Sequence, residues 1–150
     1  MQASAINSYF ATPLGFIAGF IVFWCAISFL ISFITGWYAL SLRFRKQSEP
    51  LGEVRSAGPF FYTVYMRFWS HYGSVIRITA ASDALYLSVL FPFRIGHPPL
   101  RIPWDEIKLG RARRLFITSV ELTLGNQEKI PMRISQRMAR NLGILDRVPF

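Results

Sequence analysis

Residues 14–39 read LGFIAGFIVFWCAISFLISFITGWYA, a run of more than twenty positions without one charged side chain. At a rise of about 1.5 Å per residue, a helix of this length crosses a bilayer core about 30 Å thick. Asp, Glu, Lys and Arg are absent from residues 1–42, so every charge of the chain lies in residues 43–150. The sequence therefore predicts one N-terminal transmembrane helix followed by a small, charged domain.

The residues that flank this run predict its orientation. Residues 1–13 contain no Lys or Arg, whereas Arg43, Arg45 and Lys46 follow the apolar run directly. Cationic flanks stay on the cytoplasmic side of a membrane. The front of the chain lacks the basic region and the short apolar core of a cleaved signal peptide. We therefore expect a retained, single-pass anchor in the inner (cytoplasmic) membrane, with residues 1–13 extracytoplasmic and the C-terminal domain cytoplasmic.

Aromatic and basic residues at the end of the run predict the inner membrane boundary. Trp37 and Tyr38 have rings that favour the headgroup layer, and Arg43 is long enough to snorkel beyond them. With Arg45 and Lys46, these residues form the predicted membrane interface. The helix and its inner flank then occupy residues 14–42.

Small residues recur along the anchor at helical spacing. Gly15 and Gly19 form a GxxxG motif, which allows two membrane helices to approach closely, and Ser28, Ser32 and Gly36 continue the pattern. Helix pairing through Gly15 and Gly19 is one interpretation. The other is that Gly and Ser are simply common in membrane helices.

Behind the anchor, the composition changes twice. Residues 43–58 mix polar residues with Gly and Pro without a hydrophobic period, which predicts a juxtamembrane linker. Residues 59–150 then show apolar residues at every second position, which is typical of half-buried strands. The clearest strands are expected in residues 73–79, 84–90, 120–124 and 130–134, and the last two flank the turn GNQE.

Shorter runs in residues 60–68, 91–95, 99–103 and 113–118 are further candidates, and we expect about seven strands in all. The chain then reads SQRMARNLGIL, residues 135–145. Ser135 can cap a helix there, and Met138 and Leu142 lie on one stripe of it. The expected fold is thus a single transmembrane helix plus a small, mainly β domain with antiparallel strands and a C-terminal helix.

This order of elements resembles the pleckstrin-homology superfamily, in particular its GRAM-like and bacterial PH-like members. The resemblance covers residues 59 to about 148. It includes the phrase Ala84-Leu85-Tyr86-Leu87 and the later phrase IPWDEI, residues 102–107, which is similar to one in uncharacterised membrane-tethered bacterial proteins. It implies a curved antiparallel sheet closed at one end by the helix, and it implies no particular activity.

Catalytic and metal-binding patterns do not stand out. His71 and His97 are the two histidines, and neither has a second ligand close in sequence; Asp105 and Glu106 are adjacent and point apart in most backbone conformations. Cys25 is the single cysteine and lies within the apolar run. We therefore expect a non-enzymatic protein without a cofactor or metal.

Charge and aromatic residues indicate the partners. The net charge of +9 suits either nucleic acid or anionic lipid, and the anchor beside it favours the membrane over nucleic acid. The expected lipid or partner contacts are Arg94, Arg101, Arg111, Arg113, Arg114, Phe61, Tyr65 and Trp69. Our first hypothesis is a scaffold that binds a membrane protein or complex as an accessory subunit. The alternative is a module that binds anionic lipid headgroups.

Overall fold

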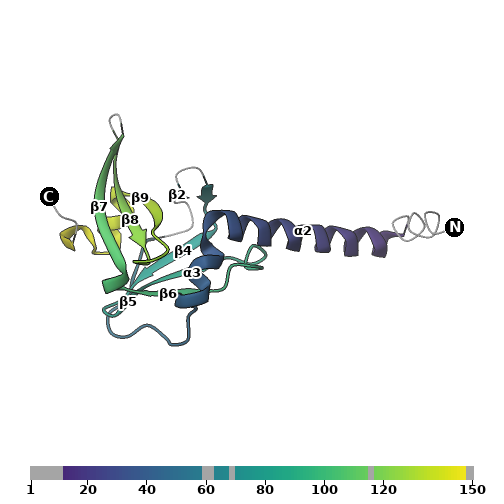
Figure 1. Ribbon diagram of the computed structural model, residues 1–150, viewed down its shortest axis with the longest axis horizontal. Coiled ribbons are helices and arrows are strands. Elements are labelled where there is room, and N and C mark those ends of the chain that lie inside the picture. Colours follow the sequence, from purple (N-terminus) through teal and green to yellow (C-terminus); the bar gives the residue numbers. More distant parts are fainter. Residues whose placement is uncertain (1–11, 59–62, 68–69, 115–116, 148–150) are drawn as a thin grey trace.

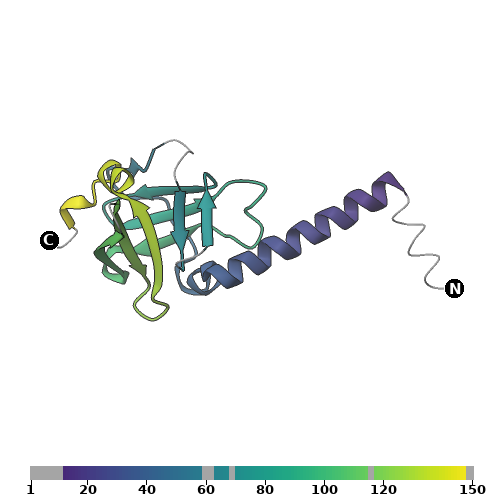
Figure 2. The same ribbon diagram turned by 90° about the horizontal axis from the view of Figure 1, so that it is seen from above.

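The computed structural model describes residues 12–58, 63–67, 70–114 and 117–147, and side chains 112–114 and 117 are not among those described. A long helix projects from a mainly β domain (Figure 1). Figure 2 shows the same arrangement from above.

The long helix is α2, Pro13–Thr35. Thr12 caps its first turn by accepting a hydrogen bond from the Gly15 N–H at 3.2 Å, and Pro13 occupies the first turn, where its missing N–H has no cost. Gly36 ends the helix with φ +84°, a left-handed conformation that glycine adopts without strain. The helix is long and apolar enough to cross a bilayer.

A short second helix, α3 (Trp37–Phe44), turns back into the domain and buries Trp37, Leu40 and Phe44. Directly after it, Arg45 pairs with Leu100 as a β-bridge, and strand β1 (Arg55–Ser56) pairs with β4. The domain core therefore includes residues from the expected inner flank and linker. It begins well before residue 59, because the side chains of α3 have no other apolar surface to cover them.

The domain contains two antiparallel sheets. One has the order β1-β4-β5-β6 and the other β3-β2-β9-β8-β7. Their bounds are β2 Thr63–Met66, β3 Ser70–Gly73, β4 Ile76–Ala80, β5 Ala84–Val89, β6 Leu100–Pro103, β7 Ile107–Arg114, β8 Ile117–Leu124 and β9 Ile130–Ser135. Short 3-10 turns, Trp104–Glu106 and Leu145–Arg147, precede β7 and follow the C-terminal helix.

The two sheets share one hydrophobic core. Ile78, Leu87 and Ile102 of the first sheet belong to the same buried cluster as Leu122 and Met132 of the second. Burial alternates along β4 and β9, as expected for strands with one face on the core. Helix α4 (Gln136–Asn141) closes the core with Met138 and Ala139, and the Ser135 hydroxyl accepts from the Met138 N–H.

The expected mainly β domain with antiparallel strands and a C-terminal helix is confirmed. The strand expected at residues 91–95 is wrong, because these residues form successive turns in the connection between β5 and β6. The single strand expected at residues 113–118 is also wrong, because β7 ends at Arg114 and β8 begins at Ile117. Strands β1 and β3 were not expected, since neither is long enough to show an alternating pattern.

Candidate functional site

The connection between β5 and β6 lies along the C-terminal half of α2. We call residues 90–99 the β5–β6 loop; both views show it reaching toward the helix (Figures 1 and 2). The Trp24 indole N–H donates to the carbonyl oxygen of Pro92 at 3.4 Å, and its ring lies 5.2 Å from that of Phe93. The loop and the helix are thus in contact as far as Trp24.

Close approach continues toward the end of the helix. The Ser32 hydroxyl donates a short hydrogen bond to the Gly96 carbonyl oxygen. Gly96 has φ +75°, and a Cβ atom there would lie 3.0 Å from the Cα of Phe29. Only glycine fits this position well, because any side chain would be strained and would press on the backbone of α2.

A chain of buried polar groups connects α2, β3 and the loop. The Tyr72 hydroxyl lies 2.9 Å from Thr35 Oγ1 and 2.9 Å from Nε2 of His97. His97 Nδ1 lies 3.1 Å from the Ile95 carbonyl oxygen, and the Trp37 indole N–H donates to the Pro98 carbonyl at 2.9 Å. Every buried side-chain polar atom in the described part of the chain has a hydrogen-bond partner.

Burial determines the protonation states of Tyr72 and His97 in this series of hydrogen bonds. It raises the pKa of Tyr72 to about 12 and lowers the pKa of His97 below its ordinary value. Both groups are therefore neutral at neutral pH. A neutral chain of hydroxyl and imidazole groups holds two elements together without burying a charge.

A pocket of about 400 Å³ opens beside these groups, and we call it the junction pocket. Both histidines contribute to it, together with Ser28, Thr35 and Tyr72. Its lining includes no Asp, Glu, Lys or Arg. His71 and His97 are far apart in the sequence. The pairing of β3 with β2 positions His71, and the path of the β5–β6 loop brings His97 to the same pocket.

A second pocket, of about 480 Å³, lies on the adjacent face of α2. Arg45 and Arg94 line it with Tyr38, Phe29 and Leu42. Neither arginine forms an ion pair among the described residues, and no acidic residue lines the pocket. We call it the arginine pocket; it offers two unneutralised guanidinium groups beside an apolar wall.

The other residues expected at the membrane interface are engaged within the domain. Trp37 is fully buried, so its ring is not available to a headgroup layer. Arg43 forms ion pairs with Glu106 at 2.9 Å and with Glu128 at 3.0 Å, which fixes α3 to the turns before β7 and β9. Lys46 pairs with Glu49 at 2.8 Å.

The described members of the expected lipid or partner contacts have different surroundings. Arg94 lies in the arginine pocket, whereas Arg101 of β6 is bound to Asp83 at 2.9 Å. The Asp83 carboxylate is desolvated by burial, yet its pKa is lowered because Tyr86, the Leu51 N–H and Arg101 donate to it. Arg101 is therefore a structural cation.

Two of the remaining expected contacts, Tyr65 and Arg111, lie on strands of the second sheet. Arg111 is exposed on β7, and Tyr65 of β2 is 45% exposed with its ring 5.6 Å from that of His71. Phe61 and Trp69 lie outside the described residues. So do the side chains of Arg113 and Arg114, whose backbone continues β7.

The small residues of the anchor separate into two groups. Ser28 and Ser32 are buried against the chain's own domain, while Gly15 and Gly19 lie on the part of α2 that the domain does not cover. The C-terminal part of the small-residue pattern thus has an intramolecular explanation. Pairing through Gly15 and Gly19 stays a prediction.

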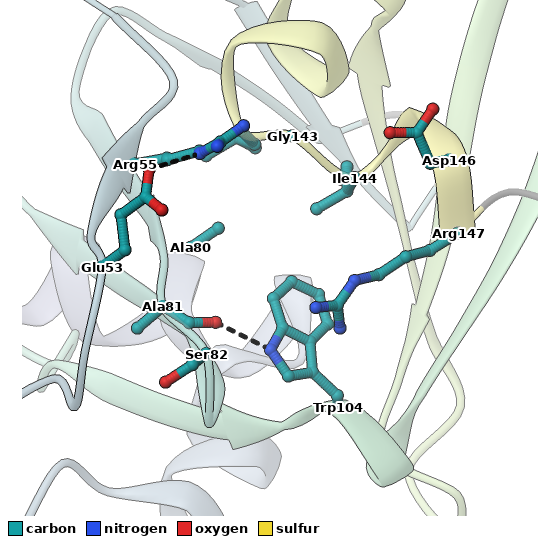
Figure 3. Close-up of a pocket in the computed structure, with 11 residues that line it drawn as sticks. Glu53, Arg55, Ala80, Ala81, Ser82, Trp104, Gly143, Ile144, Asp146 and Arg147 are labelled. Carbon is teal, nitrogen blue, oxygen red and sulfur yellow. Dashed lines mark hydrogen bonds and ion pairs between the residues drawn. The ribbon is translucent and has the colours of Figure 1, made fainter.

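A third pocket, of about 360 Å³, lies beside the C-terminal residues, and we call it the distal pocket. Figure 3 shows Glu53 and Arg55 on one side, Asp146 and Arg147 on the other, and Trp104 at its floor. The Trp104 indole N–H donates to the Ala81 carbonyl at 2.9 Å, and the Arg147 guanidinium lies 4.6 Å from the ring centre. Trp104 therefore packs against the core and also presents a face to the pocket.

No group of three or more potential metal-ligating side chains occurs in the residues that the structure describes. No protein-family model, curated protein or solved structure matches this chain. Fold and site together define a class of protein: one apolar helix packed at its C-terminal end on a two-sheet β domain, with the arginine pocket beside the helix.

Proposed function

We propose that this protein is a membrane-anchored, non-enzymatic module that binds anionic lipid headgroups in the arginine pocket. The observation that carries the proposal is that Arg45, directly after α3, and Arg94, in the β5–β6 loop, line one pocket at the foot of an apolar helix. Guanidinium groups bind phosphate oxygens through two parallel hydrogen bonds. Phe29 and Leu42 supply the apolar wall that the glycerol and acyl parts of a lipid require.

The proposed placement puts α2 across the inner membrane and the β domain on its cytoplasmic side. It is supported by the charge distribution, since the first cations of the chain follow α2. With the headgroup layer at the foot of α2, the arginine pocket meets anionic lipid without any movement of the domain. Each arginine near such a surface contributes about 1 kcal/mol.

The proposed fold family is the PH-like superfamily. Two antiparallel sheets followed by one C-terminal helix support it. Proteins with one fold serve different ligands, so the fold leaves the ligand open and the arginine pocket carries the argument.

The test is lipid binding by the full chain in detergent, measured by native mass spectrometry with phosphatidylglycerol or phosphatidylcholine. The double variant Arg45→Gln, Arg94→Gln removes both cations and should weaken phosphatidylglycerol binding about 30-fold, since two contributions of about 1 kcal/mol are lost. Phosphatidylcholine binding should not change.

The matched control is Arg137→Gln with Arg140→Gln, two exposed arginines of α4 at the opposite end of the domain. It removes the same net charge at a distance from α2. Equal weakening in both double variants would mean that only net charge matters, and it would remove the arginine pocket from the proposal.

A second candidate function is the protein-binding scaffold that the sequence suggests first, and the distal pocket favours it. Asp146 and Arg147, which line this pocket, belong to the last 3-10 turn, which Figure 1 shows in yellow at the end of the domain away from α2. A membrane lipid does not reach this end in the proposed placement. The paired charges of the pocket and the Trp104 ring suit a peptide segment of mixed charge. A photo-crosslinking amino acid in place of Ser82 should then yield one stoichiometric protein adduct in cells, whereas the same probe at Gln136 should yield none.

A further inference from the structure

We propose that the β5–β6 loop inserts its tip into the hydrocarbon layer beside α2, so that two elements of the protein, not one, enter the bilayer. This inference rests on the proposed placement of α2 in a membrane. It is independent of headgroup binding in the arginine pocket. The partner is the acyl-chain region of the bilayer itself.

The first argument is the depth that the loop reaches. Pro92 and Phe93 contact Trp24, which lies about 16 Å from the end of α2 at about 1.5 Å per residue. A bilayer core of about 30 Å matched to the 23 residues of α2 includes Trp24 near its middle. A loop that touches Trp24 therefore lies at membrane depth.

The second argument is the exposure of apolar side chains at the loop tip. Phe91 is 84% exposed, the highest value among the large hydrophobic residues that the structure describes. Phe93 and Ile95 are 38% and 37% exposed. The exposed parts of these side chains are apolar, as are the exposed side chains of α2, and acyl chains cover both kinds of surface equally well.

The third argument concerns backbone N–H groups, which must find partners inside a bilayer. Prolines at positions 92, 98 and 99 remove three N–H groups from this ten-residue loop. The N–H groups of Phe93 and His97 donate to Leu90 and Arg94 within the loop at 2.8 Å and 3.0 Å. The loop thus has seven N–H groups, and those of Leu90, Phe93 and His97 donate to backbone carbonyl groups.

Backbone carbonyl groups have the same requirement, and α2 and α3 meet it. Side chains of Trp24, Ser32 and Trp37 donate to the carbonyl oxygens of residues 92, 96 and 98. In water these carbonyls would bind solvent and need no such donors. Irregular backbone inside a bilayer needs hydrogen-bond donors from the protein itself. The two helices supply three such donors to this loop.

The position of Arg94 limits the insertion to the tip. Arg94 lines the arginine pocket beside Tyr38, near the foot of α2. Its side chain can extend to the headgroup layer while Phe91 and Phe93 remain deeper. The loop is thus amphipathic along its length.

The experiment measures the depth of a fluorescent probe in vesicles of phosphatidylcholine alone, so that anionic lipid plays no part. Cys25, the single cysteine, is replaced by serine, and the environment-sensitive fluorophore NBD is attached to Phe91→Cys in the full chain. Two reference sites are labelled in the same background: Phe16→Cys in α2 and Leu51→Cys, which is 63% exposed between α3 and β1.

Spin-labelled acyl chains should quench the probe at residue 91 as they quench the probe at residue 16. Iodide in the aqueous phase should quench the probe at residue 51 several-fold more than the probe at residue 91. Thermal unfolding of each labelled protein establishes that the variants are folded.

The outcomes separate this inference from the placement of α2. Quenching by spin-labelled lipid at residue 16 but not at residue 91 overturns loop insertion and leaves the anchor in place. Absence of lipid quenching at both residues overturns the anchor and the loop together. In native membranes, a probe at residue 91 shielded from both lipid and iodide would show that a protein covers the loop, which also overturns the inference.

Discussion

The two halves of α2 differ in what surrounds them. Residues 13–23 expose apolar side chains in all directions, whereas residues 24–35 bury Ser28, Ser32 and Thr35 against the β domain. The hydroxyl groups occur where the β5–β6 loop and Tyr72 offer hydrogen-bond partners. The first half of α2 is thus free of the domain, whereas one face of the second half packs on it.

This difference implies that the orientation of the domain relative to the anchor is set by packing. Gly36 turns the chain, α3 enters the core, and the chain of Thr35, Tyr72 and His97 connects helix to sheet. A free linker would let the domain rotate about the anchor. A packed junction presents the arginine pocket and the loop on a fixed side.

The largest expected effect comes from removing the side chain that holds α3 in the core. Trp37→Ala deletes a fully buried indole and its hydrogen bond to Pro98, and we expect the free energy of unfolding to fall by about 3–5 kcal/mol. Urea unfolding in detergent, monitored by circular dichroism, measures this change in the free energy of unfolding. Tyr38→Ala, at a side chain 36% exposed, is the neighbouring control and should lower it by less than about 1.5 kcal/mol. Equal losses of unfolding free energy in the two variants would contradict the assignment of Trp37 to the core and Tyr38 to the surface.

The same substitution in the two halves of the anchor should act in opposite directions. Gly36→Ala places a Cβ atom 2.6 Å from Ile130 Cδ1 in a left-handed conformation and should lower the free energy of unfolding by about 1–3 kcal/mol. Gly19→Ala lies within the uncovered half of α2. It should leave the free energy of unfolding unchanged or raise it slightly, because alanine favours helix. Denaturant midpoints compare the two. A stable Gly36→Ala protein would show that α2 and the domain are not rigidly joined.

Loss of one hydroxyl should have a smaller effect. Ser32→Ala leaves the Gly96 carbonyl without its donor, and we expect a loss of about 1 kcal/mol in the free energy of unfolding. Hydrogen exchange of residues 90–99 should also increase. Ala18→Ser adds a hydroxyl in the uncovered half and should alter neither quantity, so a response there would weaken the comparison.

The pH dependence should be the smallest effect. Burial lowers the pKa of His97 below its ordinary 6.5, so below about pH 6.5 the unfolded chain binds a proton that the folded chain does not. Stability is therefore complete above this pH and decreases as the pH falls below it. Thermal unfolding between about pH 8 and pH 5 measures the slope. His97→Gln should be less stable but have a flatter profile, and an unchanged slope would assign the pH dependence to other groups.

Much of the domain could be predicted because its signals are local. Alternation in β4 and β9 and the Ser135 cap are properties of a few consecutive residues, and they are confirmed. The strand β5 is also confirmed, but its burial does not alternate, because Tyr86 on the expected outer face is buried as well. Residues 91–95 misled the same reasoning, since a short apolar run has the composition of a strand. These residues form successive turns instead, and Pro92 and Phe93 contact α2.

The candidate site was less predictable for a related reason. Tyr38, Arg45 and Arg94 were each expected at a membrane or partner surface, but their common pocket depends on the β-bridge between Arg45 and Leu100. Arg43 and Arg101 were expected there too, and their acidic partners are distant in sequence. Charge counts identify cations, and only spatial neighbours reveal which of them are already neutralised.

By itself, the sequence determined the apolar helix, its boundary with the charged part of the chain and the alternating strands, because hydropathy and side-chain direction accumulate over consecutive residues. Tertiary structure alone decided that Trp37 is core, that both histidines line one pocket, and that the β5–β6 loop follows α2. Those features depend on contacts between residues far apart in the chain. Such contacts form only when burial of the shared core offsets the entropy of closing the loops between them.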